Sequence, residues 1–485
     1  MPSPPGGRPL SPTAAKLRLV ENKATLPHVT PEARRYALRE LARRAGVSRD
    51  FFEQWSLEAA SEHTTVSLGS SSGKKIHFHH SAGDSLSKIA GGPIPVARAG
   101  WLDHPPGALA GTDLVLPFCE SEADSRAPLY QPSGDGNLNC RLDLLSSLLL
   151  TLSRVEETLG DTRDEHGRFP ASASVAHRHE FLERPILDEH GLAFAQALSF
   201  LLPSWRPSPP PLRFKLTHDM DDIGIPFELG ASLGHSLKRG RPAATLRSVL
   251  SPLTAVDPPE LAMIRSLAAI SNSRGLHSAF YWKASPAGPY DSGYDPAHGK
   301  VQRVVEFLQK CGFELGIHPG YETFGNWPRL ASEVEHLRRA LRLHSPGGRQ
   351  HYLRWSPGTW LDWEACGLSY DSSLGFADRF GFRAGTAFPY RPWSWRDNRE
   401  LNLIEVPLIL MDCTPVKYMK LSRPEGLARI QTLIRRTERT GGVFTLLWHN
   451  TPLLDPDYDG WYERILDLVA DVPPFHVPAN AEELW

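Results

Sequence analysis

From residue 212 onward the sequence alternates between short runs of β-forming residues and helical segments, and this alternation constrains the fold most. The strand-like runs are LRFKLT (212–217), HSAFYW (277–282), FELGI (313–317), HYLRWS (351–356), LIEVPLIL (403–410) and VFTLLWH (443–449). Between them, apolar residues recur at helical spacing over 301–308 and over 330–341. Strands that alternate with helices predict a parallel sheet or a β/α barrel, because each crossover helix covers a face of the sheet.

A proline-dense stretch, LLPSWRPSPPPL (201–212), precedes this pattern and cannot continue a helix or a central strand. It predicts a boundary between two domains. We therefore expect a smaller α+β domain over 31–205 and the α/β domain over 210–485. Residues 1–30 are rich in Pro, Gly and Ser without periodicity, which predicts a disordered leader.

The first half of the chain contains weaker indications of secondary structure. The segment PEARRYALRELARRAGVSRDFFEQW predicts two short helices around Gly46. Short strands are expected at TTVSL and KKIHFH, followed by a linker-like stretch up to the apolar segment DLVLPF (113–118) and an apolar helix over 142–157. Part of the first segment also has the look of a helix-turn-helix, which keeps DNA binding as a minor alternative.

Composition excludes several classes of protein. The formal net charge is -2, so no basic surplus indicates a nucleic-acid or anionic-membrane partner. No apolar run approaches the roughly 20 residues that span a bilayer. The first 20 residues lack the apolar core of a signal peptide, so we expect a cytoplasmic protein. The five cysteines form no CxxC pair, which makes a disulfide framework or a structural zinc knot unexpected.

Acids and histidines gather where the expected strands end. The chain has THDMDD after the first strand, HPGYE after the third, HYLR at the fourth and WHN after the last. The residues concerned are Asp219, Asp221, Asp222, His318, Tyr321, Glu322, His351, Arg354 and His449. Side chains at the carboxyl ends of parallel strands converge on one side of a barrel, where active sites lie. A single Asp after a strand is most often a helix cap, but three acids within four residues exceed what capping needs.

This set of residues suits metal-assisted hydrolysis. A divalent ion held by Asp and His acidifies a bound water molecule, and a further acid can accept the proton of that water. A histidine on the opposite side can then protonate the leaving amine. An arginine such as Arg354 can orient a carboxylate through paired hydrogen bonds.

At these motifs the sequence resembles the polysaccharide deacetylases of carbohydrate esterase family four, over roughly residues 210–485. THDMDD stands at the Asp-rich first motif of that family, HPGYE at its metal-histidine motif and RWSPGTW at its Arg-Pro motif. SYDSS resembles the later acidic motif and LLWHN the final motif with the catalytic histidine. Residues 142–191 resemble a domain of unknown function that precedes such deacetylase-like domains in bacterial proteins.

The resemblance implies a distorted (β/α) barrel and a role for each residue. Asp219 is expected as the base, Asp221 and His318 as metal ligands, and His449 as the acid. The family has a second histidine four residues after the first, where this chain has Glu322. Either Glu322 or His351 then completes the metal site, or the metal is bound weakly or not at all; of the two ligands we favour His351. The metal is expected to be zinc, with cobalt, nickel or manganese as alternatives.

The resemblance also implies a carbohydrate substrate. We expect Tyr321, Asp222, Trp355 and Asp371 to contact it, and one or two of the nearby aromatic residues to be exposed for stacking on sugar rings. The hypothesis is a hydrolase that removes an N-acetyl group from a sugar of a surface polysaccharide or of its precursor. The alternative is an inactive barrel that binds carbohydrate or scaffolds polysaccharide biosynthesis. Sugar, linkage and oligomeric state are left open.

Overall fold

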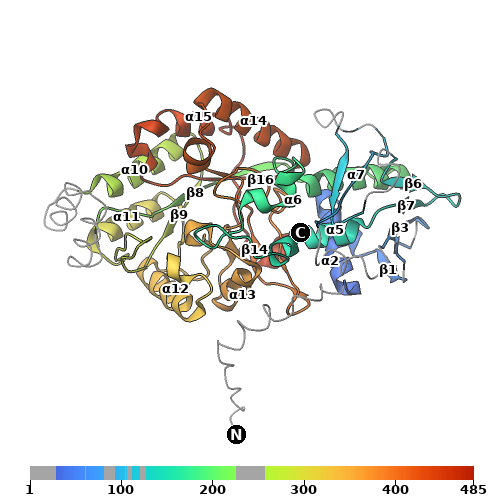
Figure 1. Ribbon diagram of the computed structural model, residues 1–485, viewed down its shortest axis with the longest axis horizontal. Helices are drawn as coiled ribbons and strands as arrows, with labels where there is room; N and C mark the ends of the chain where they lie inside the picture. The colour runs from blue at the N-terminus through green and yellow to red at the C-terminus, as the bar shows by residue number, and fades with distance from the viewer. Residues whose placement is uncertain are drawn as a thin grey trace, which may run out of the picture.

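The computed structural model describes residues 29–485 apart from 61, 71, 81–92, 104, 106–111, 121–126 and 226–256. The chain forms a mixed α/β structure with two sheets of five strands (Figure 1). The expected leader lies outside the described residues except for its end, where Val29 is buried and Thr30 caps the first described helix.

The N-terminal part, blue to green in Figure 1, combines a mostly antiparallel sheet with several helices. The sheet has the order β1-β2-β3-β7-β6, and β3 pairs with β7 in parallel. Its strands are β1 (Ser56–Ala59), β2 (His63–Ser67), β3 (Lys75–His79), β7 (Leu138–Cys140) and β6 (Tyr130–Pro132), beside the hairpin β4 (Val96–Ala99) and β5 (Leu114–Pro117). The helices are α2 (Pro31–Arg44), α3 (Arg49–Phe52), α5 (Leu144–Leu152), α6 (Val175–Arg178) and α7 (Ile186–Leu201). Helix α2 packs against both α5 and α7.

Helix α2 gives no support to the DNA-binding alternative. It begins with the Thr30 cap and a proline in its first turn, as its sequence predicts. Two of its arginines are used inside the protein: Arg43 is buried, and Arg44 is fully buried and pairs with Glu40 and Asp188. The following helix α3 has only four residues. The end of α2 is therefore packed into the fold, because its buried arginines cannot reach a phosphate or a base edge.

The C-terminal part is built on a parallel sheet with the order β10-β9-β8-β16-β15. The strands are β8 (Leu212–Asp219), β9 (Ser278–Trp282), β10 (Glu314–Ile317), β15 (Leu410–Met411) and β16 (Gly442–Leu447). Helices α10 (Pro259–Ser273), α11 (Gly299–Lys310), α12 (Trp327–Leu341), α13 (Pro357–Ala365), α14 (Arg423–Thr440) and α15 (Trp461–Asp467) lie outside these strands in Figure 1. All six residues of β16 are buried, as expected of a parallel strand that is covered on both faces.

Two further strand segments continue the parallel arrangement. Gly348 bridges Ile317 of β10 on one side and Asp371 on the other. Asp371 belongs to β11 (Tyr370–Asp371), which pairs in parallel with β14 (Ile404–Glu405). Farther along the same stretch, Asp412 donates its backbone N–H to the carbonyl of Leu447 in β16. The chain from 404 to 412 thus hydrogen-bonds to β11 at its start and to β16 at its end.

One expected strand is wrong. Residues 351–356 form no strand; they include a 3-10 turn, η6 (His351–Leu353), in which Tyr352 and Leu353 have φ values of 62° and 53°. Such left-handed backbone cannot pair in a sheet. The parallel arrangement is continued instead at Gly348, where an added Cβ would lie 1.9 Å from the carbonyl oxygen of Ile317. The close backbone approach at that position requires glycine.

The two parts share one continuous hydrophobic core and a buried ion pair. Arg383 of the C-terminal part binds Glu157 through contacts of 2.9 and 2.6 Å, and both side chains are almost fully buried. Asp188 likewise accepts the Thr386 hydroxyl and the Ala387 N–H. Among the described residues, no helix has the length and apolar character needed to cross a bilayer.

Candidate metal centre

The expected site residues come together at the carboxyl end of the parallel sheet. Asp219 ends β8 and Asp221 follows it by two residues. His318 directly follows β10, and His449 stands two residues after β16. Because β16, β8, β9 and β10 are parallel neighbours, these side chains leave the sheet at the same edge.

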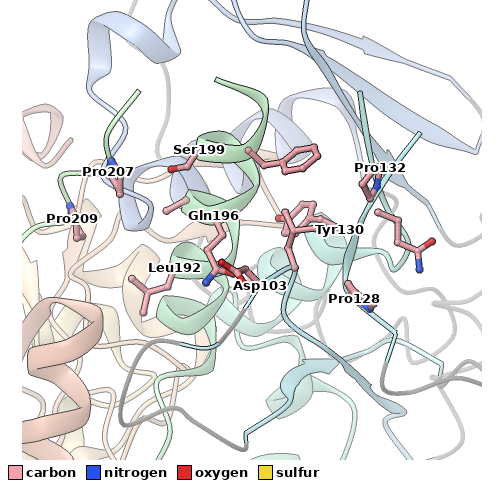
Figure 2. A pocket seen from close by; sticks show the side chains of 13 residues that line it. Asp103, Pro128, Tyr130, Pro132, Leu192, Gln196, Ser199, Pro207 and Pro209 are labelled. Atoms are coloured by element: carbon pink, nitrogen blue, oxygen red, sulfur yellow. The ribbon is translucent and has the colours of Figure 1, made fainter. Parts of the chain in front are cut away.

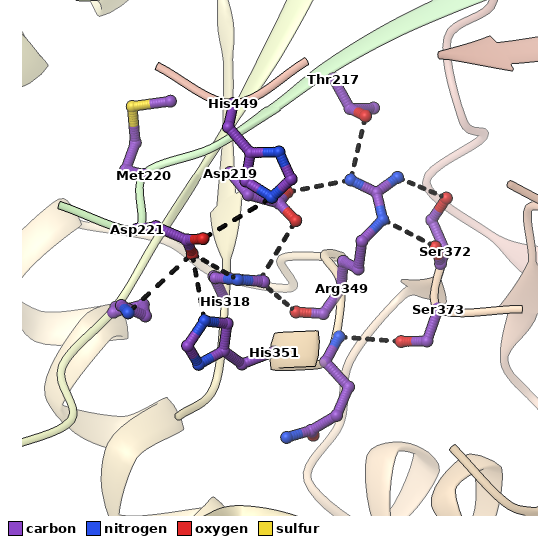
Figure 3. A network of polar contacts seen from close by, with 12 residues as sticks. Thr217, Asp219, Met220, Asp221, His318, Arg349, His351, Ser372, Ser373 and His449 are labelled. Atoms are coloured by element: carbon purple, nitrogen blue, oxygen red, sulfur yellow. Dashed lines mark hydrogen bonds and ion pairs between the residues drawn. The ribbon is translucent and has the colours of Figure 1, made fainter. Parts of the chain in front are cut away.

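At the centre of this site one carboxylate oxygen faces two imidazole nitrogens (Figure 3). Asp221 Oδ1 lies 3.1 Å from His318 Nε2 and 3.3 Å from His351 Nε2. In a tetrahedral zinc site with bonds of about 2.0–2.1 Å, the donor atoms lie about 3.3 Å apart. The three donors also suit a divalent transition metal by chemistry, since imidazole and carboxylate are its common ligands. This group therefore fits the expected ion, and it draws its second nitrogen from His351.

Both imidazoles are turned toward Asp221 by contacts at their other nitrogen. His318 Nδ1 lies 2.7 Å from the carbonyl oxygen of Arg349, and His351 Nδ1 lies 2.8 Å from Asp291 Oδ1. A carbonyl or carboxylate at Nδ1 selects the tautomer in which Nε2 carries its free lone pair. The site is thus arranged for Nε2 coordination by both histidines.

Asp291 and Lys283 form a second charged layer around the triad. Asp291 Oδ2 accepts the backbone N–H of Tyr321 at 2.9 Å, and Lys283 Nζ lies 3.3 Å from Asp291 Oδ1. The same Nζ is 3.9 Å from Asp221 Oδ1. Burial raises the pKa of Asp221, but electrostatic contact with His351 and Lys283 outweighs it and holds that pKa well below its ordinary value. The surroundings of Asp221 therefore favour the ionised carboxylate.

Asp219 is held by an arginine that the sequence analysis did not select. Arg349 is fully buried and donates from Nη1 to Asp219 Oδ1 at 2.9 Å and to Thr217 at 3.0 Å. Its Nε and Nη2 donate to the carbonyl and hydroxyl of Ser372. The guanidinium thus fixes the Asp219 carboxylate next to the triad, where Asp219 Oδ2 lies 3.6 Å from His318 Nδ1.

His449 approaches Asp221 from the opposite side and is held by Asp412. The Nδ1 atom of His449 lies 2.9 Å from Asp412 Oδ1, and its backbone N–H donates to Asp412 Oδ2 at 2.7 Å. Its Nε2 lies 3.6 Å from Asp221 Oδ2. Burial lowers the pKa of His449, but the Asp412 carboxylate outweighs this and raises it well above the ordinary value. The Asp412 carboxylate therefore favours the protonated form of His449.

Cys413 also lies beside Asp412 and His449, and the three could share an ion by distance alone. Asp412 is already committed to two N–H groups of His449, and burial raises the pKa of the Cys413 thiol. A neutral thiol is a poor metal ligand. The triad of Asp221 is therefore the better metal site.

Two of the expected site residues take other positions. Arg354 does not reach the carboxylates: its Nε donates to the His166 carbonyl at 2.9 Å and its Nη1 to the Tyr321 carbonyl at 2.6 Å. The contact with Asp219 belongs to Arg349. Glu322 is exposed in the short turn after HPG and stands outside the triad. The turn points its side chain to solvent because the neighbouring Tyr321 takes the buried position.

The residues expected to contact a substrate differ in how far they are exposed. Trp355 is 2% exposed and packs against Trp360, so it offers no face to a sugar. Asp371 is fully buried and accepts the N–H and hydroxyl of Ser373, while burial raises its pKa to about 6. Asp222 is exposed and accepts the Gly224 N–H. Among the aromatic candidates, Tyr321 is 7% exposed. Trp327, at the start of α12, is 43% exposed.

Sequence reasoning missed Lys283, Asp291, Arg349 and Asp412. Lys283 and Asp412 directly follow β9 and β15, so their places at strand ends were a usable signal. Arg349 stands between a Gly-Gly pair and His351 but was passed over for Arg354. Asp291 lies in a loop, where no spacing rule identifies it.

The structure also contains a hollow in the N-terminal part (Figure 2). It has a volume of about 770 Å³ and shares no lining residue with the metal triad. Its walls are largely proline and apolar, with Tyr130 and Gln196 between them and Phe200 at 52% exposure. Asp103 is the one acidic residue among its lining residues, so this hollow has no group of metal ligands.

Comparisons with known proteins give one family match and two similar solved structures. Residues 24–203 match a family of unknown function (DUF7033). The chain resembles the solved structure of a candidate polysaccharide deacetylase from Mycobacterium smegmatis, with 16% identity over 56% of this chain and 88% of that one, at a TM-score of 0.38. It also resembles a candidate polysaccharide deacetylase involved in O-antigen biosynthesis from Bordetella bronchiseptica, with 14% identity over 43% of this chain and 84% of that one, at a TM-score of 0.25. The comparison with curated proteins gives no match.

Proposed function

We propose that the protein is a metal-dependent hydrolase that removes an N-acetyl group from a sugar of a surface polysaccharide or of its precursor. One observation carries the proposal: one oxygen of Asp221 faces the Nε2 atoms of His318 and His351, and its other oxygen faces the Nε2 atom of His449. A ligand set beside a proton donor is the arrangement that amide hydrolysis requires.

Asp221, His318 and His351 would hold the ion, which we propose to be zinc, with cobalt, nickel or manganese as alternatives. When bound, such an ion supplies a Lewis acid for the amide carbonyl and for the attacking water. The carboxylate and the two imidazoles leave further coordination positions open, as catalytic sites need.

Asp219 is the proposed general base. Arg349 holds one of its oxygens, so the carboxylate keeps one orientation beside the ligand His318. It accepts the proton of the water whose oxygen adds to the acyl carbon. Since Arg349 is itself fixed by Ser372 and Thr217, the base is positioned by groups that do not move during the reaction.

His449 is the proposed general acid. Asp412 holds its Nδ1, which leaves the Nε2–H to protonate the sugar nitrogen as the C–N bond breaks. The products are acetate and a free amine on the sugar. The raised pKa supports this role, because it favours the form that carries the transferable proton.

We also propose that residues 210–485 form the distorted (β/α) barrel, with 31–205 as an α+β domain packed against it. The double pairing of residues 404–412, with β11 at one end and β16 at the other, supports a closed ring of parallel strands.

The test is acetate release from N-acetylated oligosaccharides by the zinc-loaded protein, with a chelated sample as the control. Asp219→Asn and His449→Ala should each lower turnover by about 10²- to 10⁴-fold and keep their metal. Asp221→Ala should lose metal and activity together. Full acetate release by all three folded variants would disprove the mechanism.

A second candidate function is carbohydrate binding without catalysis. Lys283 favours it, because its buried ammonium can offset the charge of Asp221 with no ion present. Metal analysis separates the two candidates: an inert protein should hold far less than one equivalent of zinc, cobalt, nickel or manganese.

A further inference from the structure

A turn from the N-terminal part, residues 164–168, reaches the metal site of the C-terminal part. The turn is internally fixed: Asp164 Oδ1 accepts the N–H groups of His166 and Arg168, each at 2.9 Å. Gly167 has a φ of 74°, which closes the turn. The whole turn lies within the region that matches the family of unknown function.

Three contacts dock this turn on the other part of the chain. Arg354 donates to the His166 carbonyl at 2.9 Å, and Arg168 donates to the Tyr352 carbonyl at 3.0 Å. His166 Nδ1 lies 3.3 Å from the Tyr321 hydroxyl. Tyr352 is held in a left-handed conformation, which costs free energy and persists only where the surroundings enforce it. Docking of the turn is therefore part of what holds the residue next to His351.

The turn meets a cluster of aromatic rings. Tyr290 stacks on Tyr321 with centroids 4.2 Å apart, and the Arg354 guanidinium lies 4.0 Å from the same Tyr321 ring. Two groups this close must occupy opposite faces of that ring. The His166 and Tyr352 rings meet Tyr290 edge-on at 5.3 and 5.6 Å. Tyr290 therefore forms the outer layer of a rigid stack, and its side chain is 39% exposed.

This stack adjoins the metal triad. The Tyr352 ring centroid is 4.7 Å from that of His351. Tyr290 directly precedes Asp291, whose carboxylate holds both His351 and the backbone N–H of Tyr321. A molecule whose reacting group lies at the triad can thus place a neighbouring ring at Tyr290.

We propose that the turn 164–168 of the N-terminal part completes a sugar-binding subsite beside the metal triad, with Tyr290 as the stacking face and His166 as its edge. This inference rests on the proposed function. The chemistry it recognises is a pyranose ring that presents C–H groups to Tyr290 while the adjoining N-acetylated residue lies at the metal. Aromatic faces that are already fixed bind such rings with little loss of conformational entropy.

The experiment measures calorimetric binding of two probes, chitotetraose and a hyaluronan tetrasaccharide, to the zinc-loaded full chain. Tyr290→Ala and His166→Ala should each lower affinity for the bound probe by about tenfold. The matched control is Phe200→Ala, which removes an exposed aromatic ring of the N-terminal part outside this cluster. Zinc content and Tm should match those of the parent in all three.

The outcomes separate the subsite from the catalytic proposal. Unchanged affinity in both Tyr290→Ala and His166→Ala overturns the subsite, as does a parent protein that binds neither probe. A parent that binds a probe without releasing acetate counts against hydrolysis, while loss of affinity in the variants still supports the subsite. Equal loss in Phe200→Ala would overturn the assignment of binding to this cluster.

Discussion

Replacing Asp291 with alanine should weaken metal binding although Asp291 is not itself a ligand. The substitution removes the carboxylate that lies 2.8 Å from His351 Nδ1, so the imidazole loses the contact that turns Nε2 toward Asp221. It also removes the closer of the two acidic partners of Lys283, whose remaining partner is Asp221 at 3.9 Å. The ammonium then competes with the metal for the ligand carboxylate.

Both effects lower the affinity of the site for zinc. Loss of a group that orients a metal-bound histidine costs about 10- to 100-fold in affinity. This corresponds to about 1.4–2.7 kcal/mol of binding free energy. Because the freed charge of Lys283 adds to the loss of orientation, we expect about 100-fold for Asp291→Ala. Asp291→Asn should lose less, since its amide oxygen can still accept from His351 Nδ1.

The measurement is zinc affinity by competition with a chelator of known strength, on protein whose Tm is recorded in the metal-free state. Asp295→Ala is the matched control, because Asp295 is 44% exposed and lies four residues farther along the same loop. It should bind zinc as the parent does. If folded Asp291→Ala also binds zinc with parental affinity, then either His351 is not a ligand or Asp291 does not position it.

Three further outcomes are expected. Asp412→Asn should lower the pKa of His449, so the basic limb of the pH–rate profile should move to lower pH; an unmoved limb would exclude His449 as the acid. Gly348→Ala should destabilise the protein by about 3 kcal/mol because its Cβ would meet the Ile317 carbonyl, whereas Gly358→Ala, with only a Ser356 contact at 3.6 Å, should leave Tm nearly unchanged. Zinc at about 100 times its Kd should stabilise the fold by about 2.7 kcal/mol and raise Tm, and a chelator should reverse the shift; a Tm that ignores both would argue against the site.

The secondary structure was predictable wherever local pattern and tertiary packing agree. The strands at 212, 278, 314 and 443 are apolar runs that the structure buries on both faces. The strand predicted over 351–356 was wrong because the backbone forms a tight turn there. His351 and Leu353 turn inward from a left-handed turn, and no local propensity encodes that conformation.

The site too was predictable in part from the sequence and in part only from the tertiary structure. The amino-acid sequence determined that Asp221, His318 and His449 follow strands, and parallel strands bring such residues to one edge whatever the details of packing. Only the tertiary structure decided that His351 rather than Glu322 stands beside Asp221, because this choice depends on the backbone path through two loops. Only the tertiary structure shows which groups orient the histidines and where the turn 164–168 docks. These contacts join residues 31 to 188 positions apart in the sequence, and sequence periodicity does not predict contacts over such separations.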